Sequence, residues 1–162
     1  MRSIIVIAHN IRSTHNVGAL FRTCDGFGVE QLILSGYSPY PLLPHDTRLP
    51  HLAQAITRRI HKTALGAETY VPFCHQPTPD IEALRRAGYR IVGLEQDPQA
   101  VELHSYRPPM KIALIIGEEV AGIADDIRRA CDDLLEITMT GKKESLNVSV
   151  ATGIALYHLQ LP

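Results

Sequence analysis

Short runs of β-branched and aliphatic residues alternate with helical segments along most of this chain. The strand-like runs occupy residues 3–8, 31–35, 69–73, 89–95, 111–119 and 134–139. Apolar residues follow a helical spacing in 17–27, 51–64, 78–88, 121–132 and from about residue 145 onward. Strands and helices that alternate in this way are typical of a parallel sheet covered on both faces. The sequence therefore predicts an α/β fold with a mostly parallel sheet and helices on both faces.

The segment TPDIEALRRAG carries the most complete helix signal in the chain. Thr78 is expected as its N-cap, Pro79 as its first helical residue and Gly88 as its end. The run TYVPF just before it is expected to be an edge strand, because its proline cannot donate a ladder hydrogen bond.

Length and composition predict one domain over residues 1–162, without a repeat or linker. The formal charge is −1, so a polyanionic partner would need a local basic patch. The three cysteines are scattered and form no C-x-x-C, which argues against a disulfide framework and a zinc site and leads us to expect no metal. The N-terminal apolar run is too short for a signal peptide or a membrane span. We therefore expect a soluble cytoplasmic protein.

Parallel α/β sheets bind ligands at the carboxyl ends of their strands, so the residues that follow each strand are the candidates for a site. After the first strand, Asn16 and Gly18 stand at the start of a helix and Arg22 follows Asn16 by six residues. Each also has a structural interpretation: Asn16 as an N-cap, Gly18 as a turn residue and Arg22 as a surface charge. This segment alone does not decide between them.

The strand at 111–119 runs into IIGEEVAGI, with a glycine directly after the apolar run. This is neither the G-x-G-x-x-G dinucleotide fingerprint nor a P-loop, so a nicotinamide dehydrogenase is not supported. A glycine here would still allow a ligand to lie against the backbone. Glu119 is expected to point either at a ligand or at nearby loop amides.

The stretch SLNVSVATGIALYHL places three polar side chains, those of Ser145, Asn147 and Ser149, before an apolar helix. Ser145 is the expected helix cap, which leaves the other two in need of partners such as a ligand or another loop. The helix is apolar nearly all round and must be buried on more than one side. In a chain of this size, that pattern favours a site at the start of the helix and a subunit interface along it.

Taken together, three segments resemble the motifs of the SpoU (TrmH) family of RNA methyltransferases, part of the SPOUT class. They are NVGALFR (16–22), GEEVAG (117–122) and ITMTGKKESLNVSVA (137–151), in the family's order and across most of the chain. The resemblance implies methyl transfer from S-adenosylmethionine to a ribose 2′-hydroxyl of structured RNA, with transfer RNA slightly favoured over ribosomal RNA. It also implies a C-terminal trefoil knot and a homodimer through the C-terminal helix, in which the partner completes the cofactor pocket.

The resemblance also implies roles for individual residues. Arg22 would lie beside the target ribose and phosphate, accompanied by four further catalytic candidates: Asn16, Glu119, Ser145 and Asn147. Arginine essentially never loses its proton, so Arg22 is expected to orient and stabilise charge rather than act as a base. The expected cofactor-binding positions are Leu94, Ile116, Gly117, Ile137, Met139 and Leu146. Thr138 and Val120 depart from the family, which often has proline and glycine there.

We expect no N-terminal RNA-binding domain of the kind that several relatives carry, so the catalytic domain and its partner subunit would have to contact RNA. The candidate surface is basic: Arg48, Arg58, Arg59, His61, Lys62, Lys142 and Lys143. The run RRIHK could equally be the solvated face of a helix. Two alternative functions remain open: a base methyltransferase on the same scaffold, and an RNA-binding module without catalysis.

Overall fold

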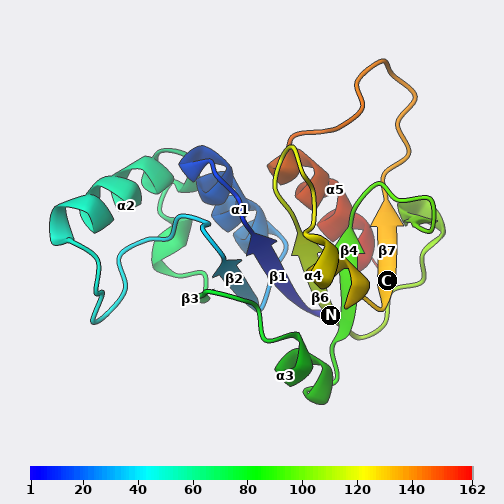
Figure 1. Cartoon of the computed structure of the whole chain (residues 1–162), viewed down its shortest axis with the longest axis horizontal. Helices are drawn as coiled ribbons and strands as arrows, with labels where there is room; N and C mark the ends of the chain where they lie inside the picture. Colours follow the sequence, from blue (N-terminus) through cyan, green and yellow to red (C-terminus); the bar gives the residue numbers. More distant parts are fainter. Residues whose placement is uncertain (162) are drawn as a thin grey trace.

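The computed structural model describes residues 1–161, which form a seven-stranded sheet in the order β3-β2-β1-β6-β4-β7-β5 (Figure 1). All six pairings between neighbouring strands are parallel. The predicted α/β fold is therefore confirmed. The strands are β1 (Ser3–His9), β2 (Gln31–Ser35), β3 (Phe73–Gln76), β4 (Arg90–Leu94), β5 (Val101–Glu102), β6 (Lys111–Ile116) and β7 (Asp133–Glu136).

Two buried clusters cover the two faces of the sheet, because successive residues of a strand point to opposite sides. In β1, Ile4 and Val6 belong to one cluster and Ile5 and Ile7 to the other. The first cluster includes residues of α1 (Thr14–Gly26), α2 (Pro50–Ala64) and α5 (Val148–Gln160). The second is covered by α3 (Ile81–Arg86) and α4 (Asp125–Arg129). Helices on both faces were predicted, and the structure confirms them.

Several predicted boundaries are wrong: the helix expected over 121–132 is limited to α4, and the strand expected over 134–139 ends at Glu136. Helix α3 starts at Ile81 because Asp80, not Thr78, accepts the hydrogen bond of a free amide in the first turn. Strand β3 begins at Phe73, so the proline before it lies outside the sheet and no ladder bond is lost. Helix α5 starts at Val148 with Asn147 as its cap, later than Ser145.

Gly18 lies inside α1 and allows α2 to approach closely, rather than forming a turn. A Cβ at this position would lie 2.1 Å from the Thr63 Oγ1 atom and 2.3 Å from the Ile60 carbonyl oxygen. The backbone oxygen cannot move aside without shifting α2. The sequence signal of Asn16 and Gly18 is therefore partly a packing requirement.

Gly18→Ala is expected to destabilise the fold by about 2 kcal/mol, since the two helices must separate to admit the methyl group. Gly26→Ala is the matched control, because a Cβ there has no neighbour within 4 Å. The control should be neutral or stabilising by up to about 1 kcal/mol. Denaturant unfolding of both variants measures the difference, and equal stabilities would contradict the close-packing explanation.

No helix within residues 1–161 is long and apolar enough to cross a membrane. In the same part of the chain, no group of three His, Cys, Asp or Glu side chains is arranged to hold a metal ion.

Candidate functional site

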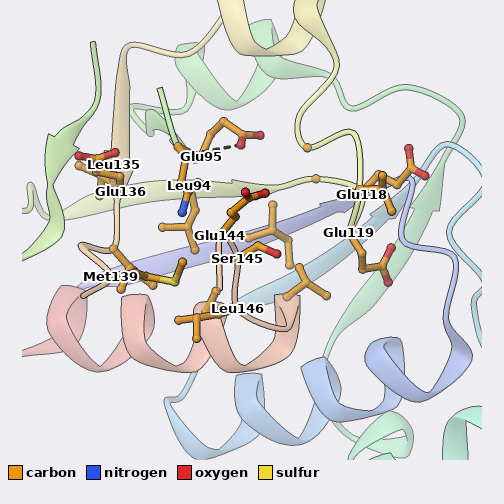
Figure 2. Close-up of a pocket in the computed structure, with 18 residues that line it drawn as sticks. Leu94, Glu95, Glu118, Glu119, Leu135, Glu136, Met139, Glu144, Ser145 and Leu146 are labelled. Carbon is orange, nitrogen blue, oxygen red and sulfur yellow. Dashed lines mark hydrogen bonds between the residues drawn. The ribbon is translucent and has the colours of Figure 1, made fainter. Parts of the chain in front are cut away.

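A pocket of about 320 Å³ opens where β4, β6 and β7 end. Four segments line it: the residues after β4, the loop after β6, the end of β7 with the residues that follow, and the start of α5 (Figure 2). The pocket therefore lies at the carboxyl edge of the parallel sheet, where this class of fold binds its ligands. Its volume is within the range of small-molecule and cofactor sites.

All six residues expected to contact a cofactor line this pocket. Leu94 and Ile116 are the last residues of β4 and β6, and Ile137 comes directly after β7. Strand ends that are far apart in the sequence meet here because the strands are adjacent and parallel. The complete set is Leu94, Ile116, Gly117, Ile137, Met139 and Leu146.

The loop after β6 closes tightly on itself between Gly117 and Gly122. The backbone amides of Glu118 and Gly122 each donate to the other's carbonyl oxygen, at 3.0 and 2.9 Å. A Cβ on Gly117 would lie 2.3 Å from the backbone of Gly122, and Gly122 has a φ of +72° with the Glu95 carboxylate packed against it. The side of Gly117 on which a Cβ would lie is thus filled by the chain itself. Gly117 still lines the pocket, so a ligand against its backbone stays a prediction.

A hydrogen-bonded cluster joins the three sequence motifs at the edge of the pocket. The Asn16 Nδ2 atom donates to Glu119 Oε1 at 2.7 Å, and the Asn147 Nδ2 atom donates to Asn16 Oδ1 at 3.1 Å. The Asn147 Oδ1 atom accepts from the Ser149 amide at 2.9 Å, which caps α5. Asn147 is thus both the helix cap and a partner of another loop. Of this cluster, Glu119 lines the pocket, as does the exposed Ser145.

Arg22 lies outside this cluster within a single chain. It is exposed on α1, does not line the pocket, and forms no hydrogen bond or ion pair with the residues that the structure describes. Six residues correspond to about 1.7 helical turns, so the side chains of Asn16 and Arg22 leave α1 about 120° apart. Three of the five catalytic candidates are therefore hydrogen-bonded to one another and Ser145 lines the same pocket as Glu119, whereas Arg22 does neither.

Five glutamates line the pocket and no lysine or arginine does, which favours a positively charged ligand and disfavours a phosphate. Glu118 is partly neutralised by Arg12, whose Nη2 atom lies 2.7 Å from its Oε1 atom. Apart from Glu119, none of these acids was singled out from the sequence. The sequence shows that most of these acids come at or after the end of a predicted strand. That the strands concerned are neighbours in the sheet is known only from the strand order. The five are Glu95, Glu118, Glu119, Glu136 and Glu144.

The predicted basic surface divides into two parts. The Arg48 side chain interacts with its own loop. It forms an ion pair with Asp46 and donates to two carbonyl oxygens, and its Cζ atom lies 3.6 Å from the ring centre of Tyr40. The Arg48 guanidinium also holds the pKa of Asp46 well below its usual range. Arg48 therefore stabilises the loop and is not a free cation. The other six candidates are exposed, on α2 and in the loop after β7, and of these His61 has its Nδ1 atom 2.5 Å from Glu68 Oε1. The remaining five are Arg58, Arg59, Lys62, Lys142 and Lys143.

An exposed apolar stripe runs along α5 from the edge of the pocket. Val150, Ile154 and Tyr157 are spaced by four and three residues within α5, so they share one helical face, and Leu146 and Leu161 lie just beyond the two ends of the helix. Tyr157 is 60% exposed and Val150 51% exposed, although most aliphatic side chains of this protein are buried. Leu146 both begins the stripe and lines the pocket. The stripe consists of Leu146, Val150, Ile154, Tyr157 and Leu161.

Comparison of the sequence with known protein families identifies the family of this chain. The model of the SpoU rRNA Methylase family matches residues 3–157. The chain belongs to the SpoU family. The family recognised from the three sequence motifs is thereby confirmed, whereas the trefoil knot remains a prediction that follows from family membership.

Curated relatives of this SpoU protein include enzymes named for two kinds of RNA. The tRNA (guanosine(18)-2′-O)-methyltransferase of Aquifex aeolicus strain VF5 is 30% identical over 98% of this chain and 69% of its own length. The 23S rRNA (guanosine-2′-O-)-methyltransferase RlmB of Coxiella burnetii strain RSA 493 / Nine Mile phase I is 31% identical over 98% of this chain and 58% of its own length. The chain thus spans little more than half of some of the relatives it matches.

Solved structures agree with the fold. The A. aeolicus TrmH/SpoU tRNA modifying enzyme superposes with a TM-score of 0.80 at 26% identity, over 99% of this chain and 75% of that structure. The SpoU methyltransferase AviRb from Streptomyces viridochromogenes, solved in complex with the cofactor AdoMet, gives a TM-score of 0.78 at 25% identity, over 98% of this chain and 57% of that structure.

Proposed function

We propose that this SpoU protein transfers a methyl group from S-adenosylmethionine to a ribose 2′-hydroxyl of structured RNA. The observation that carries the proposal is the pocket at the carboxyl ends of β4, β6 and β7, which collects all six expected cofactor positions beside the Asn16–Glu119–Asn147 cluster. Relatives named as guanosine 2′-O-methyltransferases of transfer and ribosomal RNA support the same activity.

The residues of the pocket fit this cofactor in shape and in charge. Aliphatic side chains such as Leu94, Ile137 and Leu146 suit the flat, apolar faces of an adenine. The carboxylates of Glu136 and Glu144 suit a ligand that carries a sulfonium and an ammonium group. Bound there, S-adenosylmethionine would supply an electrophilic methyl carbon next to a positively charged sulfur.

The polar residues of the chain would hold and activate the ribose. Asn16, Glu119 and Asn147 fix one another, so the donors and acceptors at the pocket edge are preorganised before RNA arrives. Arg22 would bind the neighbouring phosphate and stabilise negative charge on the 2′-oxygen as its proton is lost. Because arginine stays protonated, that proton has to leave to another acceptor.

We propose further that the protein is a homodimer whose interface includes the apolar stripe of α5. Exposed apolar patches that run along a whole helix usually mark protein–protein contacts. Helix α1 packs beside α5, through the rings of Phe27 and Tyr157 whose centroids are 6.5 Å apart. A second subunit bound to the stripe would therefore also lie near the exposed side of α1, which carries Arg22. In this arrangement Arg22 would act on the pocket of the partner subunit, since it does not line the pocket of its own chain.

Two exposed basic regions are our candidates for RNA contact. Figure 1 shows α2 at one end of the molecule, and the loop that carries Lys142 and Lys143 projecting beyond the end of β7. The residues Arg58, Arg59 and Lys62 lie on α2 and are exposed. Two separated basic regions suit a folded RNA that spans the domain, and we favour transfer RNA over ribosomal RNA.

The first experiment is calorimetric titration of the protein with S-adenosylhomocysteine, with its mass in solution measured alongside. We expect saturable binding of one ligand per chain and the mass of a dimer. NAD serves as the control ligand and should not bind, because its pyrophosphate would face the five pocket glutamates. Binding of NAD in place of S-adenosylhomocysteine would overturn the proposal.

Transfer is then assayed with S-adenosylmethionine labelled in its methyl group and with unmodified transcripts of transfer RNA and 23S ribosomal RNA. Nuclease digestion should release the label as a 2′-O-methylated nucleoside. Label on a base would instead support the base-methyltransferase alternative, and cofactor binding without transfer to either RNA would support a non-catalytic binding module.

A further inference from the structure

Beside the pocket, the loops after β1 and β2 carry two exposed residues that the catalytic cluster does not use. Arg12 follows β1, and its side chain is 71% exposed. Tyr37 follows β2 and is 53% exposed. The pKa of Arg12 is raised, and interaction with the Tyr37 side chain is the largest cause, followed by the charge of Glu118. The loops that carry the two residues lie side by side at the edge of the sheet that holds the pocket, because β1 and β2 are paired and the Ile11 amide donates to the Ser38 hydroxyl.

Glu118 connects this pair to the pocket. Its carboxylate lines the pocket with only 13% of the side chain exposed, and Oε1 lies 2.7 Å from the Arg12 Nη2 atom. Figure 2 shows Glu118 and Glu119 together at one side of the pocket. The contact uses one edge of the guanidinium. Because arginine carries five N–H donors, others remain free for a second acceptor.

Both exposed residues are held in place by buried polar contacts. Ser38, 2% exposed, donates to the Ala8 carbonyl oxygen at 2.9 Å and accepts from the Ile11 amide at 2.8 Å, so it joins the loop of Tyr37 to the loop of Arg12. The Tyr37 amide donates to the Asn10 side chain at 3.2 Å.

The fixed scaffold also contains residues with positive φ. Gly36 has a φ of +64°, and a Cβ there would lie 1.9 Å from the Asn10 Oδ1 atom. Asn10 itself has a φ of 59°, a conformation that a non-glycine residue adopts only at some cost. The His9 Nδ1 atom lies 2.9 Å from the Ser35 hydroxyl oxygen, and burial lowers the pKa of the His9 imidazole. These contacts fix the backbone of the two loops that carry Arg12 and Tyr37.

We propose that Arg12 and Tyr37 form a nucleotide-binding rim, in which Arg12 binds a phosphate beside the methylated ribose and the Tyr37 ring stacks on a neighbouring base. This inference rests on the proposed RNA methyltransferase function. Guanidinium groups pair with phosphates through two parallel hydrogen bonds, and aromatic rings stack on bases of any sequence. The rim would therefore place the RNA strand over the pocket, while the pocket glutamates keep phosphates out of the cofactor site.

The test compares Arg12→Ala and Tyr37→Ala with two matched controls, Arg107→Ala and Tyr70→Ala. Both control side chains are exposed, and both precede strands rather than follow them, so they lie at the opposite edge of the sheet. The affinities of unmodified transfer RNA and 23S ribosomal RNA transcripts are measured at several salt concentrations, with S-adenosylhomocysteine present. The affinity for S-adenosylhomocysteine itself is measured for every variant.

Each rim variant is expected to weaken RNA binding about tenfold. Arg12→Ala should also lower the slope of log affinity against log salt by about one, whereas Tyr37→Ala should leave the slope unchanged. Tyr37→Phe keeps the ring and should bind as the wild type does. Affinity for S-adenosylhomocysteine should change less than about twofold in all of them, because neither side chain lines the pocket.

Rim variants that bind RNA like the two controls would overturn the inference and leave the methyltransferase function standing. Loss of S-adenosylhomocysteine affinity in Arg12→Ala would also overturn it, since Arg12 would then serve to hold the Glu118 loop. Failure of the wild type to bind S-adenosylhomocysteine would refute the proposed function itself. Failure of the wild type to bind either RNA would refute both.

Discussion

Arg22→Ala is expected to lower the rate of methyl transfer at least about 100-fold, while S-adenosylhomocysteine binds nearly as well as to the wild type. Arg22 does not line the pocket and forms no hydrogen bond or ion pair with the residues that the structure describes, so its removal should leave the pocket intact. Its guanidinium is the group proposed to stabilise charge on the ribose oxygen. Single-turnover rates and calorimetry measure the two effects separately, with Arg107→Ala as the control for loss of an exposed arginine.

Arg22→Lys distinguishes charge from geometry. Lysine keeps the positive charge but loses the planar fork, so partial activity would indicate a mainly electrostatic role. A large loss of cofactor affinity in Arg22→Ala would show that Arg22 completes the pocket rather than acts on the ribose. Full activity of Arg22→Ala would remove it from the mechanism altogether.

Gly117→Ala is expected to abolish S-adenosylhomocysteine binding and to destabilise the fold by about 2–3 kcal/mol. The added Cβ would meet the backbone of Gly122 at 2.3 Å and the Ile123 amide nitrogen at 2.4 Å. Backbone atoms cannot turn aside, so the loop after β6 would have to open and the pocket wall would be lost. Thermal unfolding and calorimetry measure both effects.

Gly141→Ala is the matched control, since a Cβ there has no neighbour within 4 Å. It should bind S-adenosylhomocysteine like the wild type. Equal behaviour of the two alanine variants would contradict the close approach of Gly117 and Gly122.

The same two variants test whether Arg22 acts across the dimer. An Arg22→Ala subunit keeps its pocket, and a Gly117→Ala subunit keeps its arginine. If the arginine of one subunit serves the pocket of the other, randomly mixed dimers should recover about a quarter of the wild-type activity. If it serves its own pocket, the mixture should stay inactive.

The sequence was sufficient for the fold class because hydrophobic periodicity is a local property. Strand β2 falls where its apolar run predicts, at Gln31–Ser35, and the alternation of strands and helices led to the parallel sheet. The exact ends of elements were less accessible, because several residues compete as caps. Asp80 is as good a cap as Thr78, and only its distance to the Ala83 amide decides between them.

The sequence by itself also determined the family, since three spaced motifs are highly specific even though each is weak alone. It did not determine which of their residues touch. The order of the strands brings Asn16 within hydrogen-bonding distance of Glu119 and Asn147. The helical geometry of α1 directs the Arg22 side chain away from them.

The acidic lining of the pocket and the placement of Arg12 beside Glu118 and Tyr37 come only from the tertiary structure. The physical reason is that the order of the strands in the sheet differs from their order in the sequence. The ends of β1, β2, β4, β6 and β7 therefore meet at one edge of the sheet. Local patterns report which residues follow a strand, whereas the crossovers between strands decide which of those residues become neighbours.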